Sequence, residues 1–281
     1  MKLTRKDFLK TLGATGAAAM LGVQPAKGSP SPKVSSYPFK LGLASYSFRK
    51  FSLEETIAMA NRLGMEKIAL KSMHLPLEAS PAEIKAAAQK VRDAGLDLYG
   101  AGVIYMKTED EVNNAFAYAK TAGMEMIIGV PNHELLPLVD KKVKELDIKL
   151  AIHNHGPGDD LYSSPNDVWE KIKDLDQRIG FCIDIGHVVR IKEDPAALIL
   201  KYKDRLYDLH FKDVNIAEAE GHSVEVGRGV VDIPGVLEAL LKINYSGSLG
   251  LEYEKDADDP LPGAAESVGY VKGVLKMMPV A

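Results

Sequence analysis

From Lys40 onward, short apolar runs alternate with longer segments in which apolar residues recur every three or four positions. The short runs are rich in Val, Ile, Leu and Tyr, as buried strands are, and the longer segments have the spacing of amphipathic helices. The expected strands cover residues 41–48, 67–74, 96–103, 124–130, 149–155, 180–187, 206–212 and 247–254. The pattern therefore predicts strand-helix units repeated around a parallel sheet.

Capping residues mark the starts of the expected helices. Ser52 precedes the first helical segment, Glu55 stands where it completes a capping box, and Gly64 follows the last apolar position. Polar caps, several of them followed by proline or an acid, begin later helices at Ser80, Thr108, Ser164 and Asp194.

The number of units decides the fold class. Eight strand-helix units within residues 40–281 match a (β/α)8 TIM barrel, whereas an open doubly wound sheet usually has fewer strands and a glycine-rich first turn. No Gly-x-Gly-x-x-Gly follows the first expected strand. We therefore expect an α/β fold, with a single TIM barrel over residues 40–281 and no internal boundary.

The first 30 residues differ from the rest of the chain. A basic start, with Lys2, Arg5, Lys6 and Lys10, precedes a weakly apolar run of small residues over positions 12–23. This order predicts an export signal, with residues 1–30 as signal peptide and cleavage region. Residues 31–39, which include several Ser and Pro, are expected to form a linker into the barrel.

Residues 4–10 resemble a twin-arginine signal in which Lys6 replaces the second arginine. An ordinary secretory signal is the alternative. Either signal predicts export, and the twin-arginine form predicts the bacterial periplasm. A stable membrane anchor is not expected, because the apolar run falls short of the roughly 20 residues that span a bilayer.

Composition excludes some classes of function. The chain is 46% hydrophobic and 26% charged, with a net charge of -4 and no block of basic residues, so a nucleic-acid partner is not expected. Cys182 is the sole cysteine, which rules out an internal disulfide and a cysteine-based metal site. Any metal must therefore bind to His, Asp or Glu.

Ionisable residues gather at the carboxyl ends of four expected strands, the end of a TIM barrel that holds active sites. Each alone has an ordinary explanation as a satisfied core histidine, a helix cap or a lysine that reaches solvent. Together they predict a shared divalent cation, because burying unpaired ionisable groups is costly. Imidazole with carboxylate suits Mn, Fe, Co or Zn better than Ca, and Mg fits if the ion keeps waters. The residues are His153, His155, Asp184, His187, His210, Lys212, Glu252 and Glu254.

At these residues the chain resembles the xylose-isomerase-like barrels, a family that includes sugar epimerases, sugar-phosphate isomerases, inosose dehydratases and family-two apurinic endonucleases. Asp184-x-Gly186-His187 is similar to the family's Asp-x-Gly-His element, in which the aspartate binds metal and the histidine touches substrate. His210 resembles the metal histidine of strand seven, and Glu252 the metal glutamate of strand eight. Residues 227–235 are similar to the Gly-x-Gly-x-x-Asp stretch that closes over the sugar.

The chain departs from many epimerases on strand five, where His153 stands in place of a glutamate that binds metal and exchanges a proton. The resemblance implies a divalent ion held by His153, Asp184, His210 and Glu252. A mechanism that uses two glutamates is in doubt, and one-faced enolisation followed by loss of a leaving group becomes an alternative.

The remaining polar groups are candidates for catalysis. His155, His187 or Glu254 could act as the base, and Lys71 and Lys212 could fix or polarise substrate oxygens. His74 lies near Lys71, and a surface loop would explain it without a function.

The first hypothesis for function is a metal-dependent isomerase or epimerase that acts on a neutral sugar or sugar derivative through an ene-diolate. A lyase or dehydratase acting on a keto-sugar or 3-keto-glycoside is the close alternative, and a non-catalytic sugar-binding barrel is the third. Cleavage of abasic DNA is disfavoured by the acidic charge and the export signal. The expected partner is a small sugar, and the sequence predicts no oligomeric state.

Overall fold

The computed structural model describes residues 37–278. The predicted signal peptide and most of the predicted linker lie outside these residues, so both remain predictions. Within residues 37–278, no helix is long and apolar enough to span a bilayer.

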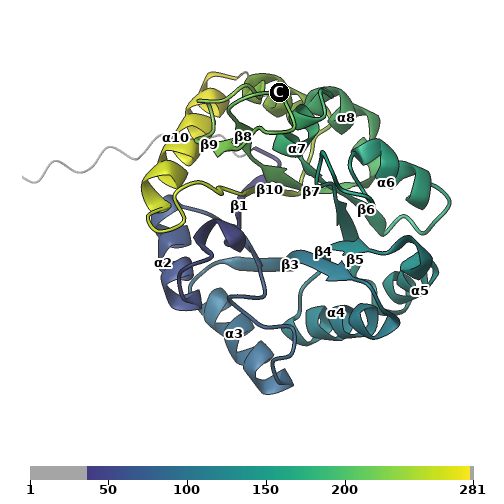
Figure 1. Ribbon diagram of the computed structural model, residues 1–281. Helices are drawn as coiled ribbons and strands as arrows, with labels where there is room; N and C mark the ends of the chain where they lie inside the picture. The colour runs from purple at the N-terminus through teal and green to yellow at the C-terminus, as the bar shows by residue number, and fades with distance from the viewer. Residues whose placement is uncertain (1–36, 279–281) are drawn as a thin grey trace, which may run out of the picture. The chain divides into compact units, whose positions relative to one another are not determined.

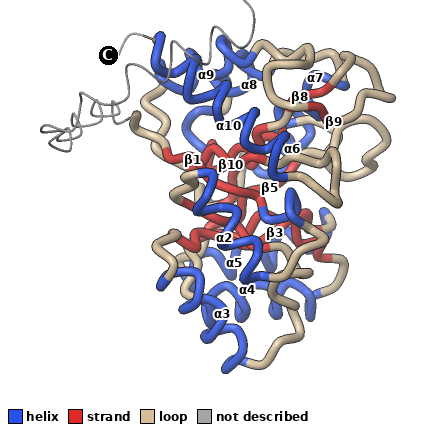
Figure 2. The backbone as a smooth tube through the Cα atoms, turned by 90° about the vertical axis from the view of Figure 1, so that its left-hand side faces the viewer, coloured by secondary structure: helices blue, strands red, loops and turns tan. Residues whose placement is uncertain are grey.

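Eight parallel strands close into a barrel, and helices surround it (Figures 1 and 2). Each strand pairs with its neighbours in chain order, and the first, β1, pairs with the last, β10. The TIM barrel predicted from the sequence is therefore confirmed. Its strands are β1 (Lys40–Ala44), β2 (Lys67–Leu70), β3 (Asp97–Met106), β4 (Met126–Pro131), β5 (Lys149–His153), β6 (Ile179–Asp184), β7 (Leu206–Phe211) and β10 (Ser248–Leu251).

The helices begin where the capping residues indicated. Ser52 and Ser80 each form a complete capping box, with Glu55 and Glu83 respectively, and Thr108, Ser164 and Asp194 cap later helices. The helices are α2 (Leu53–Leu63), α3 (Pro81–Asp93), α4 (Glu109–Ala122), α5 (Leu136–Leu146), α6 (Pro165–Ile172), α7 (Ile185–Arg190), α8 (Pro195–Lys201), α9 (Ile233–Lys242) and α10 (Leu261–Met277). Short 3-10 turns cover Ser45–Phe48, His133–Leu135 and Lys203–Arg205.

Most strands end earlier than the sequence indicated. β1 ends at Ala44 rather than at residue 48, and β2 ends at Leu70 rather than at residue 74. After β6, the chain turns at Asp184 directly into α7, because the Asp184 side chain accepts the backbone N–H of His187 and caps that helix. The polar residues beyond these strand ends have therefore left the sheet and lie at the mouth of the barrel, in loops or, for His187, in the first turn of α7.

A small hairpin follows β7 and was not expected. β8 (Asp213–Val214) pairs antiparallel with β9 (Ser223–Val224), and residues 215–222 connect them. The hairpin lies beside α7 in both views (Figures 1 and 2). It forms one wall of the cavity described below.

Candidate active site

Four side chains from four neighbouring strands converge at the mouth of the barrel. His153, Asp184 and His210 lie at or near the ends of β5, β6 and β7, and Glu252 follows β10 directly. One ligand atom of each residue lies within 4.8 Å of the others, and all four side chains are buried. The structure therefore brings together, in one cluster, the four residues that the sequence predicted as metal ligands.

The spacing of their polar atoms fits a single small cation. His153 Nε2 is 2.9 Å from His210 Nδ1 and 3.5 Å from Asp184 Oδ2, and His210 Nδ1 is 3.1 Å from Glu252 Oε2. Neighbouring ligands of an ion bound at about 2.1 Å lie about 3.0 to 3.4 Å apart in octahedral or tetrahedral geometry. These atoms could therefore share one ion with small movements of their side chains.

The two side-chain oxygens of Asp184 have different neighbours. Oδ1 accepts the His187 backbone N–H at 2.8 Å, while Oδ2 is buried and faces the cluster, 3.0 Å from Lys212 Nζ and 3.5 Å from His153 Nε2. Asn154, which follows β5, accepts the Asp184 backbone N–H at 3.0 Å and so holds the end of β6 against β5. A buried oxygen held in this manner is suited to bind a cation.

The buried ionisable groups of the cluster shift one another's pKa values. Burial lowers the pKa of His153 well below its usual value, and the neighbouring His210 lowers it further. Burial also acts to lower the pKa of His210, but the Glu252 carboxylate reverses this effect and raises the pKa. Burial opposes ionisation of Asp184 and Glu252, yet the adjacent basic groups hold both pKa values well below the usual range. The two carboxylates are therefore ionised, as metal ligands must be.

Lys212 lies inside the cluster rather than beside it. Its Nζ is 3.0 Å from Asp184 Oδ2, 2.9 Å from Glu252 Oε2 and 3.2 Å from Glu254 Oε2. Burial acts to lower the pKa of Lys212, but these three carboxylates raise it well above the usual value. One ammonium among three carboxylates leaves an excess of negative charge, which a divalent cation would offset.

Gly186 makes room for the Lys212 side chain. A Cβ atom at Gly186 would lie 3.0 Å from Lys212 Cγ and Cδ, which is tighter than ordinary contact. The glycine of the Asp-x-Gly-His element therefore allows the lysine stem to pass over the start of α7.

Glu254 lies at the edge of the cluster, where solvent reaches it. Its side chain is 36% exposed, compared with 7% for Glu252. Burial and the nearby Glu252 charge raise the pKa of Glu254 above its usual value, although Lys212 opposes the change. Glu254 thus combines access to a ligand with a pKa moved toward neutrality.

His155 lies next to His153, with ring centroids 4.5 Å apart, but it belongs to the loop after β5. Its Nε2 is 2.9 Å from the hydroxyl of Tyr105, whose ring stacks on the imidazole. Burial lowers the pKa of His155, and the acid Asp159 opposes this effect. His155 therefore faces the mouth of the barrel with one nitrogen already engaged.

His187 is placed differently from expectation. The sequence put it at the end of the sixth strand, whereas it lies in the first turn of α7, because the Asp184 cap starts a helix there. Its Nε2 is 3.8 Å from Asp184 Oδ2, so the ring still faces the cluster. Burial lowers the pKa of His187 to about 4, so the imidazole is neutral at physiological pH.

The two polar residues after β2 have different surroundings. Lys71 Nζ donates to the carbonyl of Val103, and burial lowers the lysine's pKa. His74 is buried, with Nδ1 2.9 Å from Ser45 Oγ and Nε2 3.0 Å from Thr56 Oγ1. His74 thus connects the segment after β1 to α2, and these structural contacts explain it better than an exposed loop does.

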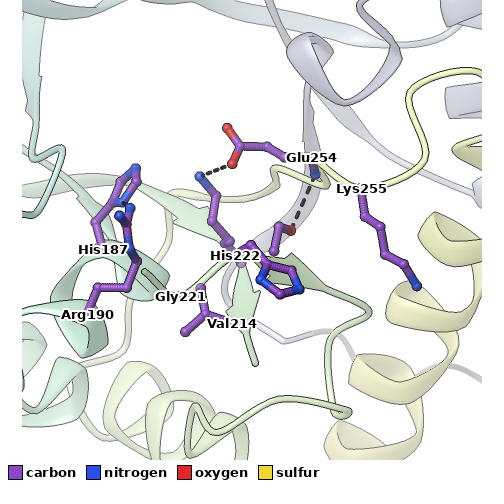
Figure 3. A pocket seen from close by; sticks show the side chains of 9 residues that line it. His187, Arg190, Val214, Gly221, His222, Glu254 and Lys255 are labelled. Atoms are coloured by element: carbon purple, nitrogen blue, oxygen red, sulfur yellow. Dashed lines mark hydrogen bonds and ion pairs between the residues drawn. The ribbon is translucent and has the colours of Figure 1, made fainter. Parts of the chain in front are cut away.

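A cavity of about 450 Å³ opens next to the cluster (Figure 3). His187 and Arg190 lie on one side of it, and Glu254 and Lys255 lie on another. Its lining residues are His187, Arg190, Lys212, Val214, Gly221, His222, Ser223, Glu254 and Lys255. The cavity is large enough for a small polar ligand that also reaches the cluster.

The Gly-x-Gly-x-x-Asp stretch folds around one buried carboxylate. Asp213 Oδ2 accepts the backbone N–H groups of Gly227 and Gly229, both at 2.9 Å, and Oδ1 accepts that of Val231 at 3.1 Å. A Cβ atom at Gly229 would lie 2.1 Å from Asp213 Oδ1, so a larger residue would displace the loop. This segment leads into α9.

Sequence reasoning missed two residues that contact the predicted site. Arg190 lies one helical turn after His187 and contacts its ring. This spacing would have identified Arg190 as a neighbour of the site if residues 185–190 had been predicted as a helix. Tyr105 contacts His155 because β3 continues to Met106, beyond its expected end at residue 103.

Comparison with known proteins places this geometry in context. Residues 52–274 match the family model described as xylose isomerase-like TIM barrel. One curated relative is the rhizopine catabolism protein MocC of Rhizobium meliloti, with 28% identity over 46% of this chain and 44% of that protein. Another is the inosose dehydratase of Lacticaseibacillus casei, with 25% identity over 41% of this chain and 43% of that protein. The matched region thus spans less than half of these relatives.

Solved structures share the fold. An L-ribulose 3-epimerase superposes with a TM-score of 0.69 and 16% identity, covering 85% of this chain and 95% of the epimerase. At this identity the likeness supports the barrel fold alone.

Proposed function

Because the chain belongs to the xylose isomerase-like TIM barrel family, we propose that it is a metal-dependent isomerase or epimerase that acts on a neutral sugar or sugar derivative. The observation that supports this proposal most directly is the convergence of His153, Asp184, His210 and Glu252 within 4.8 Å beside a cavity. We propose these residues as ligands of one divalent ion, with Mn, Co, Zn, Fe and Mg as candidates.

A divalent ion at this site would polarise a sugar carbonyl or hydroxyl and stabilise the oxyanion that forms when a neighbouring C–H loses its proton. We assign the proton-accepting step to Glu254, because its carboxylate is partly exposed, faces the cavity and has a raised pKa. Lys212 would hold the ionised carboxylates in place, with its Nζ about equally near to Asp184 and Glu252. His155 is the second candidate for the base, and Lys71 is a candidate for contact with substrate hydroxyls on the β2 side.

A dehydratase or other lyase acting on a keto-sugar or 3-keto-glycoside is the second candidate. Two observations favour it. His153 occupies the strand-five position, so no carboxylate faces Glu254 from that strand, and one base suffices for elimination. In addition, the curated relatives include inosose dehydratases.

The experiment uses the full chain. Bound metal is first measured by elemental analysis, and the protein is then stripped and reloaded with Mn, Co, Zn, Fe or Mg. Each form is incubated in deuterium oxide with a panel of neutral sugars and 3-keto-glycosides, and products are read by mass spectrometry and NMR. Asp184→Asn and Glu252→Gln serve as ligand variants, and Glu254→Gln tests the base.

The outcomes separate the candidates. Metal-dependent deuterium entry beside a carbonyl together with isomer formation supports the isomerase, whereas loss of water or of an aglycone moves the assignment to the lyase. Metal binding without exchange on any sugar of the panel means that the substrate class is wrong or that the barrel only binds sugar. Failure to bind any divalent metal overturns the proposal as a whole.

We also propose that the protein acts after export, in the bacterial periplasm. The basic start and weakly apolar run within residues 1–30 support this, and export in turn favours neutral sugars over sugar phosphates. Cell fractionation followed by amino-terminal sequencing of the mature protein tests it. Recovery of the uncleaved chain in the cytoplasm alone would contradict it.

A further inference from the structure

Arg190 and His187 lie one helical turn apart on α7, and both line the cavity (Figure 3). The guanidinium Nη1 of Arg190 is 3.0 Å from Nδ1 of His187. The other ring nitrogen, Nε2, faces the cluster of proposed metal ligands and lies 3.8 Å from Asp184 Oδ2. One nitrogen therefore contacts an arginine, and the other faces the site.

The chemistry of arginine fixes the state of the ring. A guanidinium stays protonated and has only hydrogen-bond donors, so the imidazole nitrogen that it approaches must be the acceptor. A neutral imidazole that accepts at Nδ1 carries its hydrogen at Nε2. The contact thus selects one of the two neutral tautomers of His187.

The guanidinium itself is held by the hairpin loop. Its Nε donates to the carbonyl of Ala219 at 3.2 Å, and its Nη2 donates to the same oxygen. Among residues 37–278, no carboxylate oxygen lies within 4.0 Å of the guanidinium, so no ion pair draws it away from His187. A Cβ atom at Gly221 would lie 3.3 Å from Arg190 Cγ, so the loop packs closely on the arginine stem.

We infer that Arg190 is a positioning residue that holds His187 in the Nε2–H tautomer, so that His187 donates a hydrogen bond to a substrate oxygen rather than accepting a proton. The hydrogen bond from His187 to a substrate oxygen rests on the proposed function, whereas the assignment of the tautomer rests only on the contact with Arg190. Under this assignment the base is Glu254 or His155, and the hairpin loop controls the orientation of His187 through Arg190.

Long-range proton–nitrogen NMR spectra of histidine side chains test the tautomer directly. The full chain is labelled with ¹⁵N-histidine, and the His187 signals among the seven histidines are assigned by their loss in His187→Gln. We expect an acceptor-type shift for Nδ1 and a protonated-type shift for Nε2. Arg190→Met keeps the aliphatic stem but removes the donor, and we expect both tautomers to become populated.

Lys192→Met is the matched control. Lys192 pairs with Glu218 of the same loop at 2.8 Å and lies two residues beyond Arg190, so its loss removes an exposed ion pair to the loop and leaves the contacts of Arg190 with Ala219 and His187 in place. We expect its His187 shifts to equal those of the unmodified protein. A protonated Nδ1 in the unmodified protein, or an unchanged spectrum in Arg190→Met, would overturn the inference.

Activity and metal binding separate this inference from the proposed function. If a sugar reacts, Arg190→Met should lower kcat by about 10- to 100-fold without a change in metal affinity, as expected for loss of a contact that orients a functional histidine. If no metal binds but the tautomer changes in Arg190→Met, the proposed function fails and the positioning of His187 by Arg190 is supported. An unchanged kcat in Arg190→Met would overturn the role of the tautomer in the reaction.

Discussion

The ammonium of Lys212 lies 2.9 Å from Glu252 Oε2 and 3.0 Å from Asp184 Oδ2, so it contacts oxygens of two of the four proposed metal ligands. The lysine and a metal would therefore share the same carboxylates. Because both are cations, the presence of one weakens the attraction of these carboxylates for the other. The stability of the folded protein and its affinity for metal are therefore linked.

Lys212→Met should destabilise the metal-free protein by about 3 to 5 kcal/mol, because it leaves buried carboxylates without their counter-ion. The loss should shrink when a divalent metal is added, and metal affinity should rise, since a competing positive charge is gone. Urea unfolding with and without metal measures both effects.

Lys50→Met, which removes the exposed Lys50–Asp258 pair, is the control and should change stability by less than about 1 kcal/mol. An equal loss for Lys212→Met with and without metal would contradict this linkage.

Glu254→Gln should lower the rate of proton exchange by about 10²- to 10⁴-fold, the usual contribution of a general base, while metal affinity is retained. Deuterium entry at a fixed metal load measures the first effect, and calorimetric titration of metal measures the second. His155→Gln is the matched comparison, because His155 is the other candidate base and its Nε2 already contacts the Tyr105 hydroxyl. A larger loss in His155→Gln than in Glu254→Gln would transfer the role of base to the histidine.

The fold could be predicted from the sequence because its signals are local. Apolar periodicity and caps such as Ser52 with Glu55 depend on neighbours within one or two turns, and the structure forms them where expected. The four proposed ligands could be grouped because parallel strands bring their carboxyl ends to one level. His153, Asp184, His210 and Glu252 accordingly meet there.

The contacts that refine the site depend on segments distant in sequence. The end of β6 at Asp184 follows from a side-chain cap, so strand periodicity could not place His187 on a helix. Arg190 reaches His187 in an orientation set by Ala219 on a loop whose path has no periodic signal. Lys212 lies inside the cluster because Gly186 leaves space for it, a matter of packing that spacing along the chain does not encode.

A buried carboxyl on β7 should make stability depend on pH. Burial raises the pKa of Asp208 to about 7, although His210 and the Tyr99 hydroxyl partly oppose the shift. The folded state therefore holds a proton that the unfolded state releases near pH 4, so this group lowers stability as the pH rises from about 4 to 7. Because asparagine does not ionise, the unfolding free energy of Asp208→Asn should lack this decrease of about 2 to 4 kcal/mol between pH 4 and 7. Urea unfolding of both proteins between pH 4 and 8 measures the difference in slope, and parallel curves would contradict the assignment.

The loop of residues 227–231 should depend on the single carboxylate of Asp213. Asp213→Ala leaves the amides of Gly227, Gly229 and Val231 without their acceptor and should cost about 3 kcal/mol or more, with faster hydrogen exchange at these amides. Asp213→Asn keeps one acceptor oxygen and should cost less.

The control for this loop is Asp232→Asn, because Asp232 only caps α9 through the Gly235 amide and asparagine caps a helix equally well. Its unfolding free energy should stay close to that of the unmodified protein. Urea unfolding and exchange followed by mass spectrometry distinguish the variants. If Asp213→Ala unfolds and exchanges as Asp232→Asn does, the loop holds its shape without the carboxylate and depends on other contacts.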